Sequence, residues 1–82
     1  MPTVLRIGAL RVVVYPNDHR PAHVHVVGRG HEAVFELNVA EGKVAVRENY
    51  GFSRKEVASI ARVLVQDLAQ LLTEWERIHG IA

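Results

Sequence analysis

The hydrophobic pattern changes its period once, near Ser53, and this change constrains the fold more than any other feature of the sequence. Before Ser53, apolar and polar residues alternate in short runs rich in β-branched residues, which is typical of strands. After Ser53, apolar residues recur with the 3.6-residue period of an amphipathic helix as far as Ile78. The sequence therefore predicts an α+β fold: an antiparallel sheet of about five strands, arranged as a meander of hairpins, with one long C-terminal helix packed on one face.

Turn signals separate the five runs of strand-like alternation. Residues 8–9, 28–30 and 41–42 are each typical of a hairpin turn, and residues 16–18 of a longer connection. Pro21 delays the start of the strand that follows this connection, because proline cannot donate a hydrogen bond inside a sheet. The predicted strands are residues 4–7, 11–15, 23–27, 32–39 and 43–47.

The start of the predicted helix carries a strong local signal. Ser53 and Glu56 have the spacing of a capping box, in which each side chain bonds to the other residue's backbone N–H. Phe52 and Val57 have the spacing of the hydrophobic staple that accompanies such a box. We therefore expect the helix to begin directly after Ser53, and Gly80 is the predicted residue that ends it.

The predicted helix is longer than the predicted strands on which it packs. It would have roughly 26 residues and a length of about 39 Å, whereas strands of five or six residues span only about 20 Å. Part of its apolar stripe should therefore need cover from a second copy or a partner protein. Val63 and Val65 are the stripe positions that we expect to be exposed.

Length and composition limit the class of protein. The chain has 82 residues, 49% of them hydrophobic, and no cysteine. We interpret residues 1–82 as a single domain, whose core buries only about 60% of the unfolded surface, so a homo-oligomer is expected. A secreted domain this small normally carries disulfides, so the absence of cysteine indicates the cytoplasm. No signal-peptide pattern and no apolar run near the roughly 20 residues of a membrane span is visible.

The first 31 residues contain four arginines and four histidines, and Asp18 is their only acidic residue. The net charge of the whole chain is only +1, which does not by itself indicate a nucleic-acid-binding protein. The asymmetry nevertheless suggests an anionic partner. The arginines that we predict to contact an anion are Arg6, Arg11, Arg20 and Arg47.

The turns predict the register of the sheet. A hairpin tipped at residues 29–30 places Val24 opposite Phe35 on the core face, and His25 beside Val34 and His23 beside Glu36 on the other face. A second hairpin tipped at residues 41–42 places Glu36 opposite Arg47, Val39 opposite Val44 and Leu37 opposite Val46. The first hairpin places Arg6 opposite Arg11. The predicted register therefore forms a row of His23, Glu36 and Arg47 on the face away from the helix.

Two histidines in this row are candidates for chemistry. His23 and His25 lie two residues apart on one strand, so their rings point to the same side with Cα atoms about 6.5–7 Å apart. Together they could act as a general acid and base, with Glu36 setting the tautomer of His23 and Arg47 stabilising developing negative charge. The predicted catalytic residues are therefore His23, His25, Glu36 and Arg47. The competing structural interpretation is a solvated sheet face with a Glu36–Arg47 ion pair.

A metal site is the other hypothesis for the same segment. His19, His23 and His25 could supply the three ligands that a catalytic zinc ion needs, with Asp18 as a further donor. The predicted cofactor on this interpretation is a divalent metal such as zinc. The residue types and spacing leave the acid–base, metal and structural interpretations open.

The segments PNDHRPAHVHVVGRGHEAVFELN, RENYGFS and EWERIHG resemble a family of small bacterial proteins, domain-of-unknown-function family 4160. The hallmark of the family is a proline followed by two alternating histidines and a valine, carried here by Pro21, His23, His25 and Val26. Many members have a second proline where this chain has Ala22. The match continues at residues 51–55, and the resemblance covers nearly the whole chain.

The resemblance implies a toxin–antitoxin module, because members of the family are often encoded beside another small protein. It implies that this chain resembles the toxin, and small toxins of such modules are commonly ribonucleases. Its partners would then be RNA and a small antitoxin-like protein. The alternative function is a non-catalytic interaction or regulatory module whose C-terminal helix binds a partner or dimerises.

Overall fold

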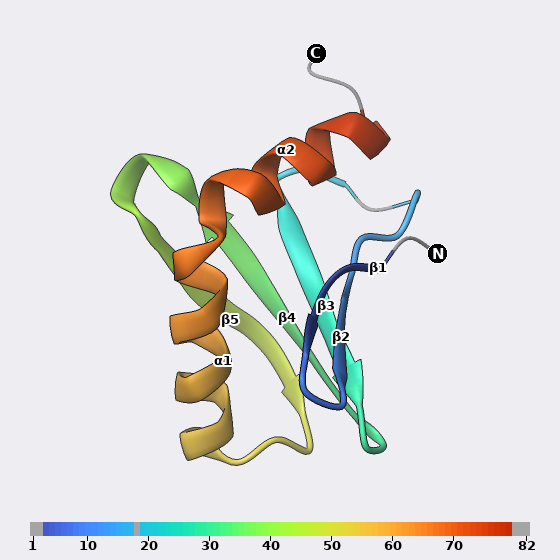
Figure 1. Cartoon of the computed structure of the whole chain (residues 1–82), viewed down its shortest axis with the longest axis vertical. Helices are drawn as coiled ribbons and strands as arrows, with labels where there is room; N and C mark the ends of the chain where they lie inside the picture. Colours follow the sequence, from blue (N-terminus) through green and yellow to red (C-terminus); the bar gives the residue numbers. More distant parts are fainter. Residues whose placement is uncertain (1–2, 18, 80–82) are drawn as a thin grey trace.

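The strands form one antiparallel sheet in the order in which they occur in the chain, as the sequence predicts. The structure is a computed structural model, and it describes residues 3–17 and 19–79. The sheet has the order β1-β2-β3-β4-β5, so consecutive strands are neighbours throughout (Figure 1). The α+β class and the five-stranded meander are therefore confirmed. The bounds are β1 Thr3–Ile7, β2 Leu10–Val13, β3 His23–Gly28, β4 His31–Asn38 and β5 Lys43–Tyr50.

Two helices, and not the single long helix predicted, follow the sheet. Helix α1 spans Arg54–Gln66 and α2 spans Leu68–His79. The backbone leaves helical geometry at Asp67, whose φ and ψ are −112° and 22° and whose N–H bonds to the carbonyls of Leu64 and Val65. The break changes the direction of the chain, and α2 runs across the end of the sheet that α1 leaves uncovered (Figure 1). Because the chain turns between two shorter helices, it does not extend beyond the strands as a straight helix of about 39 Å would.

The N-terminus of α1 has the predicted capping box. The Ser53 hydroxyl accepts a hydrogen bond from the Glu56 N–H at 3.1 Å, and the Glu56 carboxylate accepts one from the Ser53 N–H at 2.9 Å. Glu56 also accepts a hydrogen bond from Arg29 in the β3–β4 turn. The Ser53 N–H and Arg29 lower the pKa of Glu56 to about 2. The predicted helix end, Gly80, lies outside the described residues, as does Asp18.

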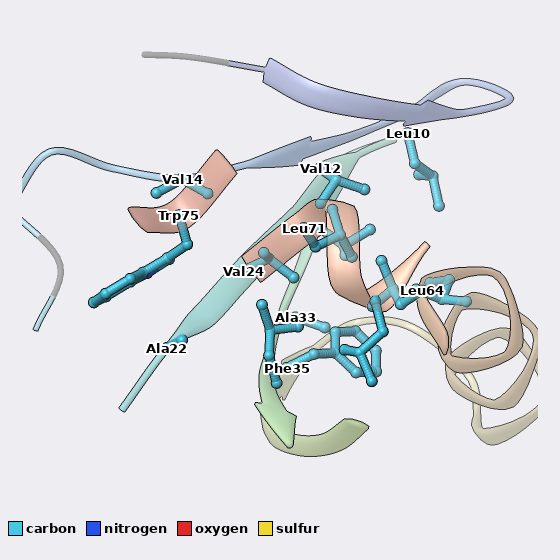
Figure 2. Packing of buried hydrophobic residues seen from close by; sticks show 14 of the residues in the cluster. Leu10, Val12, Val14, Ala22, Val24, Ala33, Phe35, Leu64, Leu71 and Trp75 are labelled. Atoms are coloured by element: carbon cyan, nitrogen blue, oxygen red, sulfur yellow. The ribbon is translucent and has the colours of Figure 1, made fainter. Parts of the chain in front are cut away.

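Side chains from the sheet and from both helices form the core. Figure 2 shows Leu64, Leu71 and Trp75 of the helices among buried side chains of the strands. The strands, with the residue directly after β2, contribute the alternating positions that the period predicts: Val12, Val14, Val24, Val26, Ala33, Phe35 and Leu37. Trp75 is 1% exposed and Phe35 fully buried. The face of the sheet that carries these residues is therefore the helix-covered face, and the alternate positions lie on the opposite face, called here the polar face.

The predicted register is right for β3–β4 and wrong for β4–β5. The residue pairs His23–Glu36, His25–Val34 and Val24–Phe35 are all present. In the next hairpin, however, Leu37 pairs with Val44 and Glu36 with Ala45. The difference arises in the turn, where residues Val39–Glu41 form the short 3-10 helix η1. The loop is therefore two residues longer than predicted, and the predicted Val39–Val44 pair does not form.

A β-bulge partly offsets this shift. The register of β4–β5 changes between Val34 and Phe35, because Val34 pairs with Glu48 while Phe35 pairs with Val46. Arg47 is the extra residue on β5.

Among the described residues, no helix is long and apolar enough to cross a membrane.

Candidate functional site

A hollow of about 200 Å³ on the polar face brings together the histidine motif and the bulge of β5. Its lining residues come from the β2–β3 connection, β3, β4 and β5: Asn17, His19, His23, His25, Val34, Arg47 and Glu48. Four of these, His19, His23, His25 and Arg47, are predicted site residues. The tertiary structure therefore places most of the predicted candidates around one small polar cavity.

The sheet holds the two histidines of the motif side by side. Their ring centroids are 5.3 Å apart, with an angle of 61° between the rings. His25 lies between Val13 of β2 and Val34 of β4 in the sheet, and both valines are buried. His23 is itself 6% exposed. Both rings therefore project from a well-packed part of the sheet, where few alternative rotamers are open to them.

A hydrogen bond at Nδ1 orients each ring. Nδ1 of His23 lies 2.9 Å from the carbonyl oxygen of Pro21, and Nδ1 of His25 lies 3.1 Å from Oε2 of Glu32. A carbonyl or carboxylate oxygen can only accept, so Nδ1 carries the proton in both rings. The lone pair of each neutral ring is therefore on Nε2.

The bulge on β5 supplies the charged side of the hollow. Arg47 and Glu48 are consecutive in sequence, yet both line the hollow together with Val34, which pairs with Glu48. In a regular strand, consecutive side chains would point to opposite faces. The extra residue in the bulge removes this alternation and directs both side chains to the polar face.

Glu36 has a different contact from the one predicted. It pairs with His23 in the ladder, but the acceptor that orients Nδ1 of His23 is the Pro21 carbonyl. The carboxylate of Glu36 forms an ion pair with Arg47, whose Nε lies 3.7 Å from Oε2. Glu36 is not among the residues that line the hollow. Its geometry therefore makes it a partner of Arg47, which it can hold in place beside the histidines.

The other predicted arginines lie outside the hollow. Arg6 pairs with Arg11, and Arg11 pairs with Val27, so both arginines are on the polar face, two residue pairs further along the ladder than His25. Arg20 lies elsewhere: its guanidinium is 5.0 Å from the centre of the Trp75 ring, a cation–π contact with the end of the core. Arg6 and Arg11 add two positive charges to the polar face outside the hollow.

The three predicted metal ligands, His19, His23 and His25, line the same hollow. Within residues 3–17 and 19–79, however, no group of three or more histidine, cysteine, aspartate or glutamate side chains is arranged to hold a metal ion. The zinc hypothesis remains a prediction that binding measurements have to test.

Four residues near the histidines were not predicted as site residues. Glu32 bonds to His25, and the Tyr15 ring meets the His25 ring edge-on with centroids 4.5 Å apart. Asn17 and Glu48 line the hollow. The register does hold a signal for Glu32, since it lies opposite Val27 and therefore diagonally beside His25. No sequence signal indicates Asn17 or Glu48, because a loop and a bulge bring them there.

Comparison with known proteins agrees with the resemblance seen in the motif. The family model described as "Domain of unknown function (DUF4160)" matches residues 10–76. The match covers most of the chain, so the protein belongs to this family. It includes every residue of the hollow. No curated protein and no solved structure matches the chain.

Proposed function

We propose that this member of the DUF4160 family cleaves RNA at the hollow on its polar face. In this proposal His23 and His25 act as base and acid, and Arg47 stabilises the charge that develops on the phosphate. The observation that carries the proposal is the placement of two imidazoles, 5.3 Å apart, in one hollow with a guanidinium. Acid, base and anion stabiliser are the three roles that phosphodiester transfer needs.

The environments of the two rings support different roles. His25 bonds through Nδ1 to the Glu32 carboxylate, which orients the ring as the acidic member of a triad does. His23 is buried and bonds through Nδ1 to a neutral carbonyl. We therefore assign the protonated acid to His25 and the neutral base to His23.

The proposed reaction balances without a further reactant. Nε2 of His23 takes the proton of the ribose 2′-hydroxyl while the 2′-oxygen forms a bond to the adjacent phosphorus. The bond from phosphorus to the 5′-oxygen breaks, and His25 donates its Nε2 proton to that oxygen. Arg47 binds the non-bridging oxygens, whose negative charge is greatest in the transition state. The products are a 2′,3′-cyclic phosphate and a 5′-hydroxyl.

The side chains favour RNA over DNA as the substrate. The nucleophile in this reaction is the substrate's own 2′-hydroxyl, which DNA lacks, and an acid and a base are enough to activate it. Arg6 and Arg11, further along the polar face, can contact neighbouring phosphates. The proposal agrees with the toxin-like role that the family resemblance implies, in which a neighbouring small protein would restrain the activity.

The direct test is cleavage of an unstructured oligoribonucleotide by the purified protein without a histidine tag. We expect a product with a 2′,3′-cyclic phosphate end, and no cleavage when the nucleotide at the cleavage site carries a 2′-deoxyribose. His23→Ala and His25→Ala should each reduce the rate roughly 10²–10⁴-fold. His79→Ala is the matched control, because His79 stacks on Trp75 and does not line the hollow.

Three outcomes would contradict the proposal: no cleavage of any RNA, cleavage that the deoxy substitution does not stop, or full activity in both motif variants. Circular dichroism should establish that the variants are folded. In cells, expression without the neighbouring gene should arrest growth, and His25→Ala should relieve the arrest.

The metal hypothesis makes a different prediction for the same assay. The acid–base mechanism predicts that EDTA leaves the rate unchanged, whereas a zinc-dependent reaction would stop. Elemental analysis of the untagged protein, with titration of zinc by calorimetry, gives an independent answer. One tightly bound metal ion per chain that is lost in His23→Ala would favour the metal site.

A further inference from the structure

The outer edge of β5 is an unpaired strand edge. β5 is the last strand of the sheet, and β4 is its single strand neighbour among the described residues. Every residue of Lys43–Tyr50 except Val44 is exposed, and Val46 is 49% exposed. An exposed edge presents unpaired N–H and C=O groups that another chain can bind by strand addition.

A groove runs between this strand and helix α1, which lies alongside β5 in Figure 1. Its volume is about 400 Å³, and it is lined by Lys43, Val44, Ala61, Arg62, Val65 and Gln66. Val65 of α1 is 39% exposed, and Val46 continues the apolar side of β5 beyond Val44. An apolar groove beside an unpaired edge offers a strand both backbone partners and a place for alternate side chains.

The charges at this surface distinguish the kinds of partner that fit it. Among the residues that the structure describes, Lys43 and Arg62 line the groove and no carboxylate does. Lys43 and Arg47 alternate with Val44 and Val46 along the strand. Lys43 has a carboxylate neighbour in Glu41 at 3.1 Å, and Arg62 bonds to the Ser59 hydroxyl at 3.3 Å. Both contacts are exposed and weak, so the two cations can exchange them for a partner's carboxylates.

A second copy of the chain fits the edge less well in the register that pairs its valines with each other twice. Antiparallel pairing of β5 with itself keeps apolar side chains on one face when Val44 lies opposite Val46 of the other copy. The same register places Lys43 opposite Arg47 twice, and like charges directly opposite each other destabilise a strand pair.

We propose that the β5 edge and its groove bind an extended segment of a partner protein in which apolar residues alternate with acidic ones. The segment adds to the sheet beside β5. Its apolar side chains contact Val44, Val46 and Val65, and its carboxylates lie beside Lys43 and Arg62, the cations that line the groove. This inference does not depend on the proposed function, because the groove and the hollow have no lining residue in common.

The test uses a fluorescently labelled synthetic peptide of alternating valine and glutamate, with an alternating valine and lysine peptide as the comparison. Fluorescence anisotropy should show binding of the acidic peptide alone. Lys43→Glu and Val65→Asp should each weaken it about tenfold or more. Lys55→Glu is the matched control: it makes the same charge change in the first turn of α1, outside the groove, and should bind like the parent. Amide hydrogen exchange should slow in β5 when the peptide binds.

Three results would overturn the proposal. The two peptides could bind equally, Lys43→Glu could bind the acidic peptide as tightly as the parent does, or the acidic peptide could fail to bind. A dimer seen in sedimentation equilibrium would also overturn the proposal if Val65→Asp dissociates it and the peptide does not. The occupant of the edge would then be a second copy of the chain. Lys43→Glu and Val65→Asp should retain the activity of the parent on RNA, so failure here is distinguishable from failure of the proposed function.

Discussion

Arg47 and Glu36 form an ion pair across β4 and β5 although they are not opposite each other in the ladder. Nε of Arg47 lies 3.7 Å from Oε2 of Glu36, while the residue opposite Glu36 is Ala45. Alternation along β5 places the guanidinium on the same polar face as Ala45 and Glu36, and the carboxylate holds it there. The pair is 44% and 41% exposed, so its net contribution to stability should be within about 0.2–1 kcal/mol.

Arg47 should therefore matter more for activity than for folding. Arg47→Ala should reduce RNA cleavage roughly 10²–10³-fold, the range for loss of a group that stabilises developing charge. The denaturation midpoint in urea should change little. Glu36→Gln should have a smaller effect on cleavage, because it leaves the guanidinium in place and removes one of its anchors. A large loss of stability in Arg47→Ala would show that its role is structural.

Gly51 should not tolerate a side chain. Its φ is +108°, and a Cβ atom there would overlap Nδ1 of His31. The His31 ring packs edge-on against Phe52, so it cannot move away freely. Gly51→Ala should therefore lower the free energy of unfolding more than Gly8→Ala does. At Gly8 φ is +58° and the space around a Cβ atom is open, so a loss of about 1–2 kcal/mol is expected there. Urea denaturation measures both, and equal costs would contradict the predicted clash.

Glu56 should make stability depend on acidic pH. Its pKa is lowered from 4.5 to about 2 by the Ser53 N–H and by Arg29, so the folded state favours the ionised carboxylate. The stabilisation is present above pH 4.5 and is lost as the pH falls toward 2. Glu56→Gln should remove this part of the pH dependence in denaturation curves, and Arg29→Ala should reduce it. An unchanged acid profile in Glu56→Gln would contradict the assignment.

Tyr50 should ionise at a higher pH than a free tyrosine. Its hydroxyl donates a hydrogen bond to Oε1 of Glu48 at 3.1 Å, and this bond and the Glu48 charge raise the pKa of Tyr50 above 10. The contribution to stability is complete below pH 10 and is lost as the pH rises through the pKa of the folded protein. In a Tyr15→Phe background, ultraviolet titration of Tyr50 should shift to lower pH when Glu48 is replaced by glutamine.

The motif residues could be placed from the sequence because strand alternation and one tight turn determine their neighbours. The β3–β4 hairpin turns at Arg29 and Gly30, so His23 had to lie beside Glu36 and His25 beside Val34. A one-residue error would have moved Val24 and Phe35 out of the core. The tautomers could not be predicted in this way, since they depend on the Pro21 carbonyl and on the diagonal carboxylate of Glu32.

By itself, the sequence determined the class of fold, the meander, the capped start of α1 and the face of the sheet that carries His23 and His25. These features follow from local periodicity and from side chain–backbone hydrogen bonds between residues close in the chain. The tertiary structure alone decided the break at Asp67, the bulge at Arg47 and the hollow that joins Asn17 to Glu48. Each of these depends on how separate elements pack. The helical segment breaks at Asp67 so that both helices cover the sheet, and the bulge at Arg47 partly offsets the register shift that η1 causes.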